Sequence, residues 1–197
     1  MSNIIVSLLL FGYLIAIYKI NFYKFYVTIN LKKMIQQDLK NARILIVDDL
    51  QTNIDILTEL LCMDGYLNIE TTTNPREVVD RTKSFDPDLI LLDLMMPYLS
   101  GFDVMDLLKV EKQKSLNPTK YLPILVLTAD ASQDVRLKAL AAGAKDFLSK
   151  PFDLLEVRLR IKNLLETQYL FQLMAEKHLT LEEKVITFLK INDEWYR

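Results

Sequence analysis

The sequence predicts an α/β fold, a doubly wound sheet of five parallel strands. The central observation is that short apolar runs alternate with amphipathic stretches between residues 42 and 151. Strands that alternate with helices in this way form a parallel sheet with helices on both faces. The flanking parts differ, because residues 4–18 carry no charge and no Gly or Pro occurs from residue 152 onward. We therefore expect an apolar N-terminal segment (1–41), a central domain (42–165) and a long helical extension (166–197).

The five strands are expected at runs of apolar or β-branched residues. Continuous apolar runs are typical of parallel strands that are buried on both faces, and the chain has three, at Arg43–Val47, Asp88–Leu92 and Pro123–Leu127. Two shorter candidates are Asn68–Thr72 and Asp146–Ser149. Periodicity alone does not separate such runs from buried helix, so the assignment also depends on the helical patterns between them.

Four helical patterns lie between these strands, at Gln51–Met63, Pro75–Ser84, Gly101–Lys114 and Ser132–Ala142. Pro75 begins one of them and Gly65 and Gly143 stand just past two others, as is usual for Pro at helix starts and Gly after helix ends. Cys62, the only cysteine, lies in an apolar helical stretch, where we expect it to be buried. A single cysteine excludes a disulfide framework and a Cys-based zinc site.

Polar residues stand where the predicted strands end. Asp48 and Asp49 follow the first strand, Asp93 the third, Thr128 the fourth and Lys150 the fifth. In doubly wound sheets the carboxyl ends of the strands share one edge, where ligands bind. We therefore expect three carboxylates, a hydroxyl and a lysine to converge there.

Such a cluster has a chemical use. Carboxylates this close repel one another, and a hard divalent cation such as Mg²⁺ relieves the repulsion. A carboxylate beside Mg²⁺ with a lysine opposite is what an aspartyl-phosphate site needs. Each residue alone has a plainer explanation, since an Asp-Asp pair at a strand end commonly caps a helix. The hypothesis depends on their joint placement at the ends of different strands.

The composition argues against two other classes of protein. Acidic and basic residues nearly balance, with a formal net charge of −2, whereas nucleic-acid-binding domains usually show a basic surplus. We therefore expect no DNA binding by this chain. The composition also argues against a nucleotide-binding protein. The four glycines are Gly12, Gly65, Gly101 and Gly143, and neither a GxxxxGK[ST] phosphate loop nor a GxGxxG fingerprint can be assembled from them.

Four segments together resemble a known family. ILIVDDLQTN, LILLDLMMPYLSGFDV, PILVLTAD and GAKDFLSKPF are similar to the signature segments of bacterial two-component response-regulator receiver domains (CheY-like). The resemblance covers about Ala42 to Leu165 and implies a flavodoxin-like fold and a cytoplasmic location. It also implies a phosphohistidine donor on a sensor histidine kinase or phosphotransfer protein. His178, the only histidine, lies in the helical tail and is not expected to be that donor.

The resemblance implies a role for each residue that matches the family's metal and acceptor positions. Asp93 would be the phosphoacceptor. Asp49 would bind Mg²⁺ directly, Asp48 would act through water, and the backbone carbonyl of Met95 would be a further ligand. An aspartate-dependent phosphohydrolase, the enzymatic alternative, would need a second aspartate at the position of Met95, so we do not expect an enzyme.

The remaining matched positions concern the phosphoryl group and the response to it. Thr128 and Lys150 would each contact a phosphoryl oxygen. The peptide bond before Pro151 is typically cis in the family. Phe147 occupies the position of the family's switch aromatic. The alternative is that Phe147 is an ordinary core residue of its strand.

The C-terminal extension reads as an imperfect heptad, adequate for a coiled coil with a partner. Its seam would contain Val157, Ile161, Leu164, Gln168, Phe171, Ala175, His178, Glu182, Val185 and Leu189. The residues after Pro151 are too few for a DNA-binding or enzymatic output domain. This leaves four interpretations: a homodimer through the helix, a regulator truncated before a lost output domain, a scaffold or adaptor whose tail binds partners, and a helix folded back on its own domain.

The N-terminal segment also has several interpretations. Residues 4–20 are nearly long enough to span a membrane, and the lysines that follow would keep the receiver on the cytoplasmic face. A membrane tether is therefore one interpretation. A misassigned start, with the protein beginning at Met34, and an additional core helix are the others.

Overall fold

The fold is described from a computed structural model, which covers residues 38–114, 121–130 and 132–176. The chain divides into two compact units, Met1–Asn41 and Ala42–Arg197, and the description below concerns the second. Five parallel strands form one sheet in the order β2-β1-β3-β4-β5. The predicted doubly wound sheet is therefore confirmed, and this strand order is the flavodoxin-like one.

The strands lie at or within one residue of the predicted positions. β1 (Arg43–Val47), β2 (Asn68–Thr72) and β5 (Asp146–Ser149) have the predicted bounds. β3 (Leu89–Asp93) and β4 (Ile124–Thr128) begin and end one residue later than predicted. Asp93 and Thr128 are thus the last residues of buried strands, not the first residues of the loops.

Local chemistry explains both shifts. Pro123 has no N–H to donate to a strand ladder, so β4 begins after it. Asp88 turns its carboxylate back to β1, where Oδ2 accepts the backbone N–H of Arg43 at 2.9 Å. The guanidinium of Arg43 also pairs with Asp88 at 3.3 Å.

Side chains cap some of the helices, whereas others begin without a side-chain cap. The predicted helix from Pro75 divides into a 3-10 turn, η1 (Pro75–Glu77), and α3 (Val78–Phe85). Ser100 caps α4, because its backbone N–H donates to Asp103 at 2.9 Å and its hydroxyl accepts from the N–H of Asp103. The other helices are α2 (Gln51–Met63), α4 (Gly101–Lys114), α5 (Gln133–Ala141) and α6 (Leu154–Glu176). The helices α2, α3 and α5 begin without a side-chain cap.

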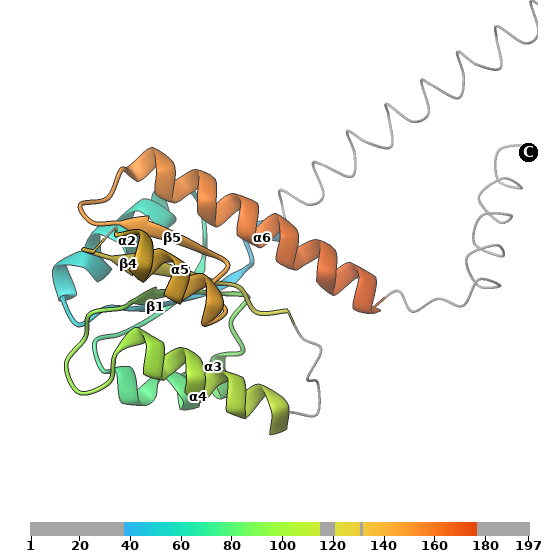
Figure 1. Cartoon of the computed structure of the whole chain (residues 1–197). Helices are drawn as coiled ribbons and strands as arrows, with labels where there is room; N and C mark the ends of the chain where they lie inside the picture. The colour runs from blue at the N-terminus through green and yellow to red at the C-terminus, as the bar shows by residue number, and fades with distance from the viewer. Residues whose placement is uncertain (1–37, 115–120, 131, 177–197) are drawn as a thin grey trace, which may run out of the picture. The chain divides into compact units, whose positions relative to one another are not determined.

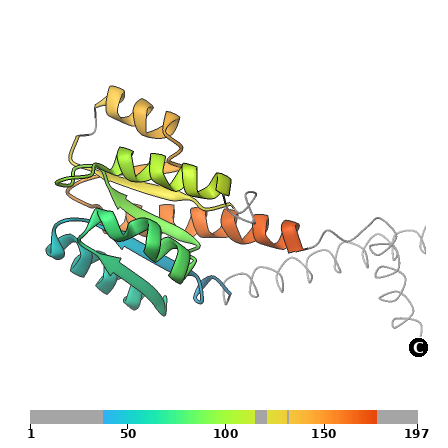
Figure 2. The same cartoon turned by 90° about the horizontal axis from the view of Figure 1, so that it is seen from below.

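Helices cover both faces of the sheet. Figure 1 shows α3 and α4 below the strands and α6 above them. On the lower side, one core cluster joins alternate residues of β1, β3 and β4 to Val78, Val104 and Met105. Only Ala139 of α5 is buried, and Figure 2 shows this helix at the outer edge of the domain. α5 is therefore held by fewer core contacts than its neighbours.

Cys62 is exposed, so the prediction that it is buried is wrong. The buried stripe of α2 consists of Ile54, Leu57, Leu60 and Leu61. Successive residues of an α-helix are about 100° apart. Cys62 therefore lies one step beyond the stripe, on the solvent side.

Most of the first half of the predicted coiled-coil seam packs against the chain's own domain. Val157, Ile161 and Gln168 are buried, and α6 packs on β3 and β5. Gln168 donates a hydrogen bond to Asp88 at 3.3 Å, and Phe171 stacks on Tyr121 with the ring centroids 4.5 Å apart. The seam prediction is wrong for this part of α6, which folds back on its own domain. The side chain of Ala175 and the later seam positions lie outside the described residues.

No helix in the described ranges is both long and apolar enough to cross a bilayer. The segment for which a tether was considered, residues 4–20, lies outside those ranges.

Candidate functional site

Three carboxylates meet at the carboxyl ends of β1 and β3. Asp48, Asp49 and Asp93 each offer one oxygen, and these atoms lie within 4.8 Å of one another. The two strands are neighbours in the sheet, with Val47 opposite Leu92, so the residues after Val47 lie beside Asp93. Asp48 and Asp93 are buried, whereas Asp49 is half-buried. The cluster is therefore mostly shielded but open to solvent through Asp49.

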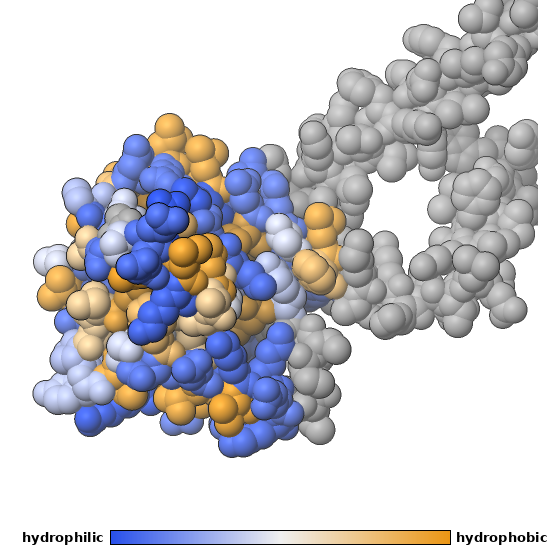
Figure 3. All heavy atoms as spheres, viewed as in Figure 1, coloured by the Kyte–Doolittle hydropathy of each residue, from blue (hydrophilic) through white to orange (hydrophobic). Residues whose placement is uncertain are grey.

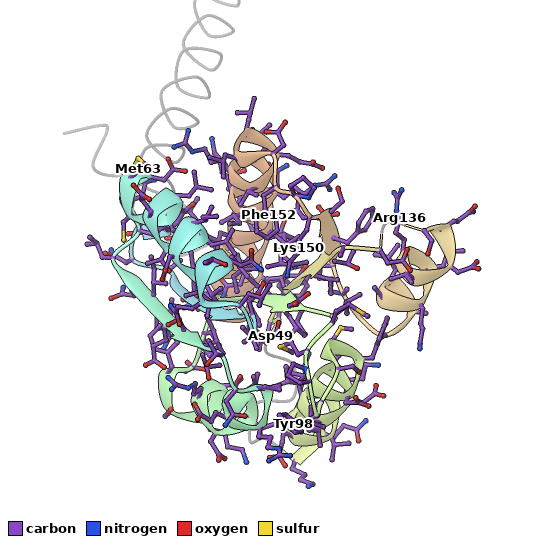
Figure 4. All side chains as sticks on the ribbon, turned by 90° about the vertical axis from the view of Figure 1, so that its left-hand side faces the viewer. Asp49, Met63, Tyr98, Arg136, Lys150 and Phe152 are labelled. Carbon is purple, nitrogen blue, oxygen red and sulfur yellow. The ribbon has the colours of Figure 1, made fainter. Side chains whose placement is uncertain are left out.

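Lys150 brings a positive charge into this cluster. Its ammonium group lies 2.7 Å from Oδ2 of Asp48 and 3.0 Å from Oδ2 of Asp93. The backbone N–H of Lys150 donates to the carbonyl of Thr128 at 2.8 Å, and the bond to Pro151 is cis. Figure 4 shows Lys150 and Asp49 close together in the middle of the view.

Further hydrogen bonds fix the two buried carboxylates. Oδ1 of Asp48 accepts from the backbone N–H of Leu50 at 3.0 Å and from the side-chain amide of Asn53 at 2.9 Å. Oδ1 of Asp93 accepts from the N–H of Met95 at 3.3 Å. The sequence reasoning missed Asn53. Its place at the end of the first signature segment was the available signal.

Burial raises the pKa of Asp93 above its ordinary value. The hydrogen bond and charge of Lys150 act in the opposite direction, and the negative charge of Asp48 adds to the rise. The charged form of Asp93 is therefore only partly compensated by the protein itself. The donor set consists of oxygen atoms from closely spaced carboxylates, which fits a hard divalent cation such as Mg²⁺.

Thr128 lies at the same edge of the sheet, one residue past Leu127, which is paired with Asp93. Its hydroxyl donates to the carbonyl of Asp130 and accepts from the N–H of Asp130, both at 3.1 Å. The carboxylate of Asp130 accepts from the N–H of Ser132 at 2.8 Å, which lowers the pKa of Asp130. The loop that leads into α5 is thus tied to the hydroxyl of Thr128.

Phe147 lies half-buried in β5, beside the lower core cluster. The guanidinium carbon of Arg136, on α5, lies 4.0 Å from the centre of its ring, and that of Arg160, on α6, lies 5.8 Å away. A cation over an aromatic face is attracted by the ring. Sequence reasoning missed both arginines, because no motif connects them to Phe147.

Gly101 packs directly against the end of β3. A Cβ atom at this position would meet the backbone carbonyl of Asp93 and lie 2.9 Å from Cα of Leu94. The N–H of Gly101 donates to the carbonyl of Leu94 at 3.0 Å. The first residue of α4 therefore holds the backbone at Asp93 in place, a role that the sequence reasoning did not assign.

Curated relatives share this part of the chain. The chain is 36% identical over 131 residues to the transcriptional regulatory protein YvrH of Bacillus subtilis (strain 168). The matched region covers 66% of this chain and 52% of YvrH. It is 33% identical over 142 residues to the response regulator SaeR of Staphylococcus aureus (strain USA300), covering 72% of this chain and 58% of SaeR. The chain thus spans little more than half the length of these relatives.

Solved structures show the same fold. The chemotaxis protein CheY4 of Vibrio cholerae is 27% identical with a TM-score of 0.56, covering 63% of this chain and 98% of CheY4. The BeF3-activated DrrB receiver domain is 25% identical with a TM-score of 0.54, covering 64% of this chain and 98% of that domain.

A family model agrees with the fold and with the carboxylate cluster. The model described as the response regulator receiver domain matches residues 44–162, a range that contains every residue of the cluster. Membership in this family implies a two-component system with a histidine kinase partner. The chain belongs to the family of response regulator receiver domains.

Proposed function

We propose that Asp93 accepts a phosphoryl group from the phosphohistidine of a sensor histidine kinase or phosphotransfer protein, and that phosphorylation switches a partner or dimer surface. One observation carries this proposal. The ammonium group of Lys150 lies 3.0 Å from Asp93 and 2.7 Å from Asp48, in a cluster whose third carboxylate is half-exposed. A buried nucleophile with a cation beside it suits an anionic substrate.

Asp48, Asp49 and Asp93 would hold Mg²⁺, and the backbone carbonyl of Met95 stays a predicted further ligand. When bound, Mg²⁺ supplies positive charge that offsets the charge on phosphoryl oxygens during transfer. Among the three aspartates Asp49 is the most accessible, which agrees with its proposed role as a direct ligand.

The residues of the chain then have separate tasks. A carboxylate oxygen of Asp93 attacks phosphorus, a P–O bond forms as the P–N bond breaks, and the electron pair of the broken bond stays on the donor imidazole. Lys150 pairs with one phosphoryl oxygen in place of a carboxylate. The hydroxyl of Thr128 donates to another after leaving Asp130.

The movement of Thr128 offers a route to the output surface. In this structure its hydroxyl holds the loop at Asp130 through two hydrogen bonds, and that loop leads to α5, which has only one buried residue. Release of the loop would therefore shift a weakly packed helix. Phe147 would respond as the switch aromatic by changing its contact with Arg136.

The phosphoacceptor is tested by intact mass spectrometry of the full chain. Incubation with acetyl phosphate and Mg²⁺ is expected to add the mass of one phosphoryl group, and Asp93→Asn is expected to abolish the addition. Asp106→Asn is the matched control, because Asp106 is an exposed carboxylate of α4. Equal modification of the wild type and Asp93→Asn would eliminate Asp93 as the acceptor.

We further propose that the site does not turn over phosphate esters. Met95 stands two residues past Asp93, its side chain is 69% exposed, and a thioether cannot act as a general acid. Hydrolysis of p-nitrophenyl phosphate by the full chain is therefore expected to stay at the level of the Asp93→Asn variant. Sustained hydrolysis that depends on Asp93 would favour a phosphohydrolase.

The scaffold interpretation predicts a different outcome in solution. A phosphorylation switch should change the molar mass or the partner affinity of the full chain when beryllofluoride and Mg²⁺ are added. This change should disappear in Asp93→Asn. A tail-driven scaffold would show the same molar mass and partner affinity in the wild type and in Asp93→Asn, each with and without beryllofluoride. Light scattering distinguishes the two.

A further inference from the structure

A second cavity lies at the opposite end of β4 from the carboxylate cluster. Its volume is about 800 Å³, within the range of small-molecule sites. Ile124, the first residue of β4, lines this cavity, whereas Thr128, the last residue of β4, lies at the candidate phosphoacceptor site. Residues of α3, α4 and the turn between α5 and β5 complete the wall.

The inner wall of this cavity is apolar. Met105 and Ile124 are buried, with exposures of 1% and 8%. Val79, Leu108 and Leu122 also line the cavity and are half-buried. An apolar group of a ligand would therefore lose its contact with water against these side chains.

The rim of the cavity is strongly basic. Five lysines and two carboxylates line it, and Figure 3 shows hydrophilic surface in blue around orange patches over α3 and α4. Glu111 forms ion pairs with two of the lysines, Lys83 at 2.7 Å and Lys114 at 3.4 Å. Within the described ranges, Lys112 and Lys145 form no ion pair. The rim thus has a surplus of positive charge that its own carboxylates do not balance.

Thr82 adds an independent observation. Its hydroxyl is buried and has no hydrogen-bond partner among the described residues, and Thr82 lines this cavity. Buried polar groups in proteins are nearly always hydrogen-bonded, to protein, water or ligand. The oxygen of this hydroxyl has almost no accessible surface, so a polar atom of a bound molecule would satisfy it after the Thr82 side chain turns toward the cavity.

We propose that the basic cavity binds a small organic anion with an apolar body. The apolar body would pack on Met105, Leu108 and Ile124, and the anionic group would lie at the rim with Lys112 and Lys145. The charge surplus selects an anion over a cation or a neutral molecule. The apolar floor selects an amphiphile over a simple inorganic ion. This site does not depend on the proposed role of Asp93.

Isothermal titration of the full chain with three probes tests the ligand class. Octyl phosphate has both features, octanol only the apolar body, and inorganic phosphate only the charge. We expect octyl phosphate to bind at least about ten-fold more tightly than either, a difference of about 1.4 kcal/mol. Equal affinity for inorganic phosphate, equal affinity for octanol, or no binding of octyl phosphate would each overturn the proposal.

Two kinds of variant test the location. The double variant Lys112→Glu/Lys145→Glu is expected to weaken octyl phosphate binding by about ten-fold or more, since it replaces attraction by repulsion. Leu108→Trp should also block binding, by filling the cavity without changing charge. Lys162→Glu, an exposed lysine of α6, is the matched control and should bind like the wild type. Unchanged binding in both cavity variants, or equal loss in the control, would refute the assignment.

Discussion

The ammonium group of Lys150 lies 3.0 Å from the carboxylate of Asp93, although 57 positions separate the two residues in the sequence. The side chains of both are largely buried, at 16% and 3% exposure. Among the described residues, Lys150 supplies positive charge to two of the three carboxylates of the cluster, Asp48 and Asp93.

Lys150→Ala is expected to destabilise the protein without divalent ions by about 3 kcal/mol, because it leaves two buried carboxylates without a cationic partner. Urea unfolding in EDTA measures the loss. Lys162→Ala is the matched control and should change the free energy of unfolding by less than about 0.5 kcal/mol. A loss of similar size in both variants would mean that the Lys150 pairs contribute nothing specific.

Mg²⁺ is expected to raise the melting temperature of the wild type, because a cation that binds only the folded state stabilises it. At ten times its Kd the gain is about 1.4 kcal/mol. Asp49→Ala should remove most of this gain. Thermal unfolding in MgCl₂, compared with NaCl at equal ionic strength, measures it. A shift that persists undiminished in Asp49→Ala would place the ion elsewhere.

Gly101→Ala is expected to cost about 2 kcal/mol, because the added Cβ collides with the backbone carbonyl of Asp93 and overpacking is expensive. It should also slow phosphorylation, since the end of β3 must move. Gly143→Ala is the comparison. It is strained at φ +106 but contacts only the flexible side chain of Lys109, so it should lose stability and keep the wild-type phosphorylation rate.

Tyr66 should make the protein lose stability in strong alkali. Burial, together with the charges of Asp64 and Glu166, raises the pKa of Tyr66 from 10.0 to about 12. Below pH 10 the phenol is protonated in both states and this contribution is fully present. Between pH 10 and 12 only the unfolded state loses the proton, so the free energy of unfolding falls by up to about 1.4 kcal/mol per pH unit.

Urea unfolding of the wild type and Tyr66→Phe from pH 9 to 12 measures this loss, and the variant should lose less stability over about two pH units. Tyr98→Phe is the control, because Tyr98 is 84% exposed. Parallel curves for wild type and Tyr66→Phe would show that Tyr66 titrates normally.

Gln168→Leu and Phe171→Ala are expected to loosen the end of α6. Gln168→Leu removes the 3.3 Å hydrogen bond that the Gln168 amide donates to Asp88. Phe171→Ala removes the ring stacking on Tyr121. Each should cost about 1 kcal/mol and speed amide hydrogen exchange after residue 168 most strongly. Leu170→Ala, a 46% exposed position of the same turn, should leave the exchange unchanged.

Sequence patterns were sufficient where buried strands end in charged or polar residues. Asp93 was predictable because a charge that closes an apolar run needs a structural or chemical reason. Lys150 was predictable only together with the other residues, from their joint placement at the ends of different strands. The bounds of β1 were predictable from its apolar run, and those of β2 and β5 from short candidate strands between the helical patterns. The one-residue shift of β3 was not, because it depends on a contact between Asp88 and Arg43 across 45 positions.

The errors share a physical origin. A heptad pattern in α6 fits a partner helix and the chain's own sheet equally well, since both need one apolar stripe. Cys62 was misplaced because its neighbours Leu60 and Leu61 are apolar, although the helical period puts it on the other side. The stacking of Arg136 on Phe147 joins an exposed helix to a strand, and no local pattern indicates it.

The attachment of α6 at Gln168 and Phe171 has a consequence for the last turn of this helix, which ends at Glu176. A helix anchored to a rigid body transmits orientation as well as position along its own length. One residue inserted after Phe171 would rotate the last turn of α6 by about 100° and advance it by about 1.5 Å. The surface that this turn presents therefore depends on its spacing from the anchor.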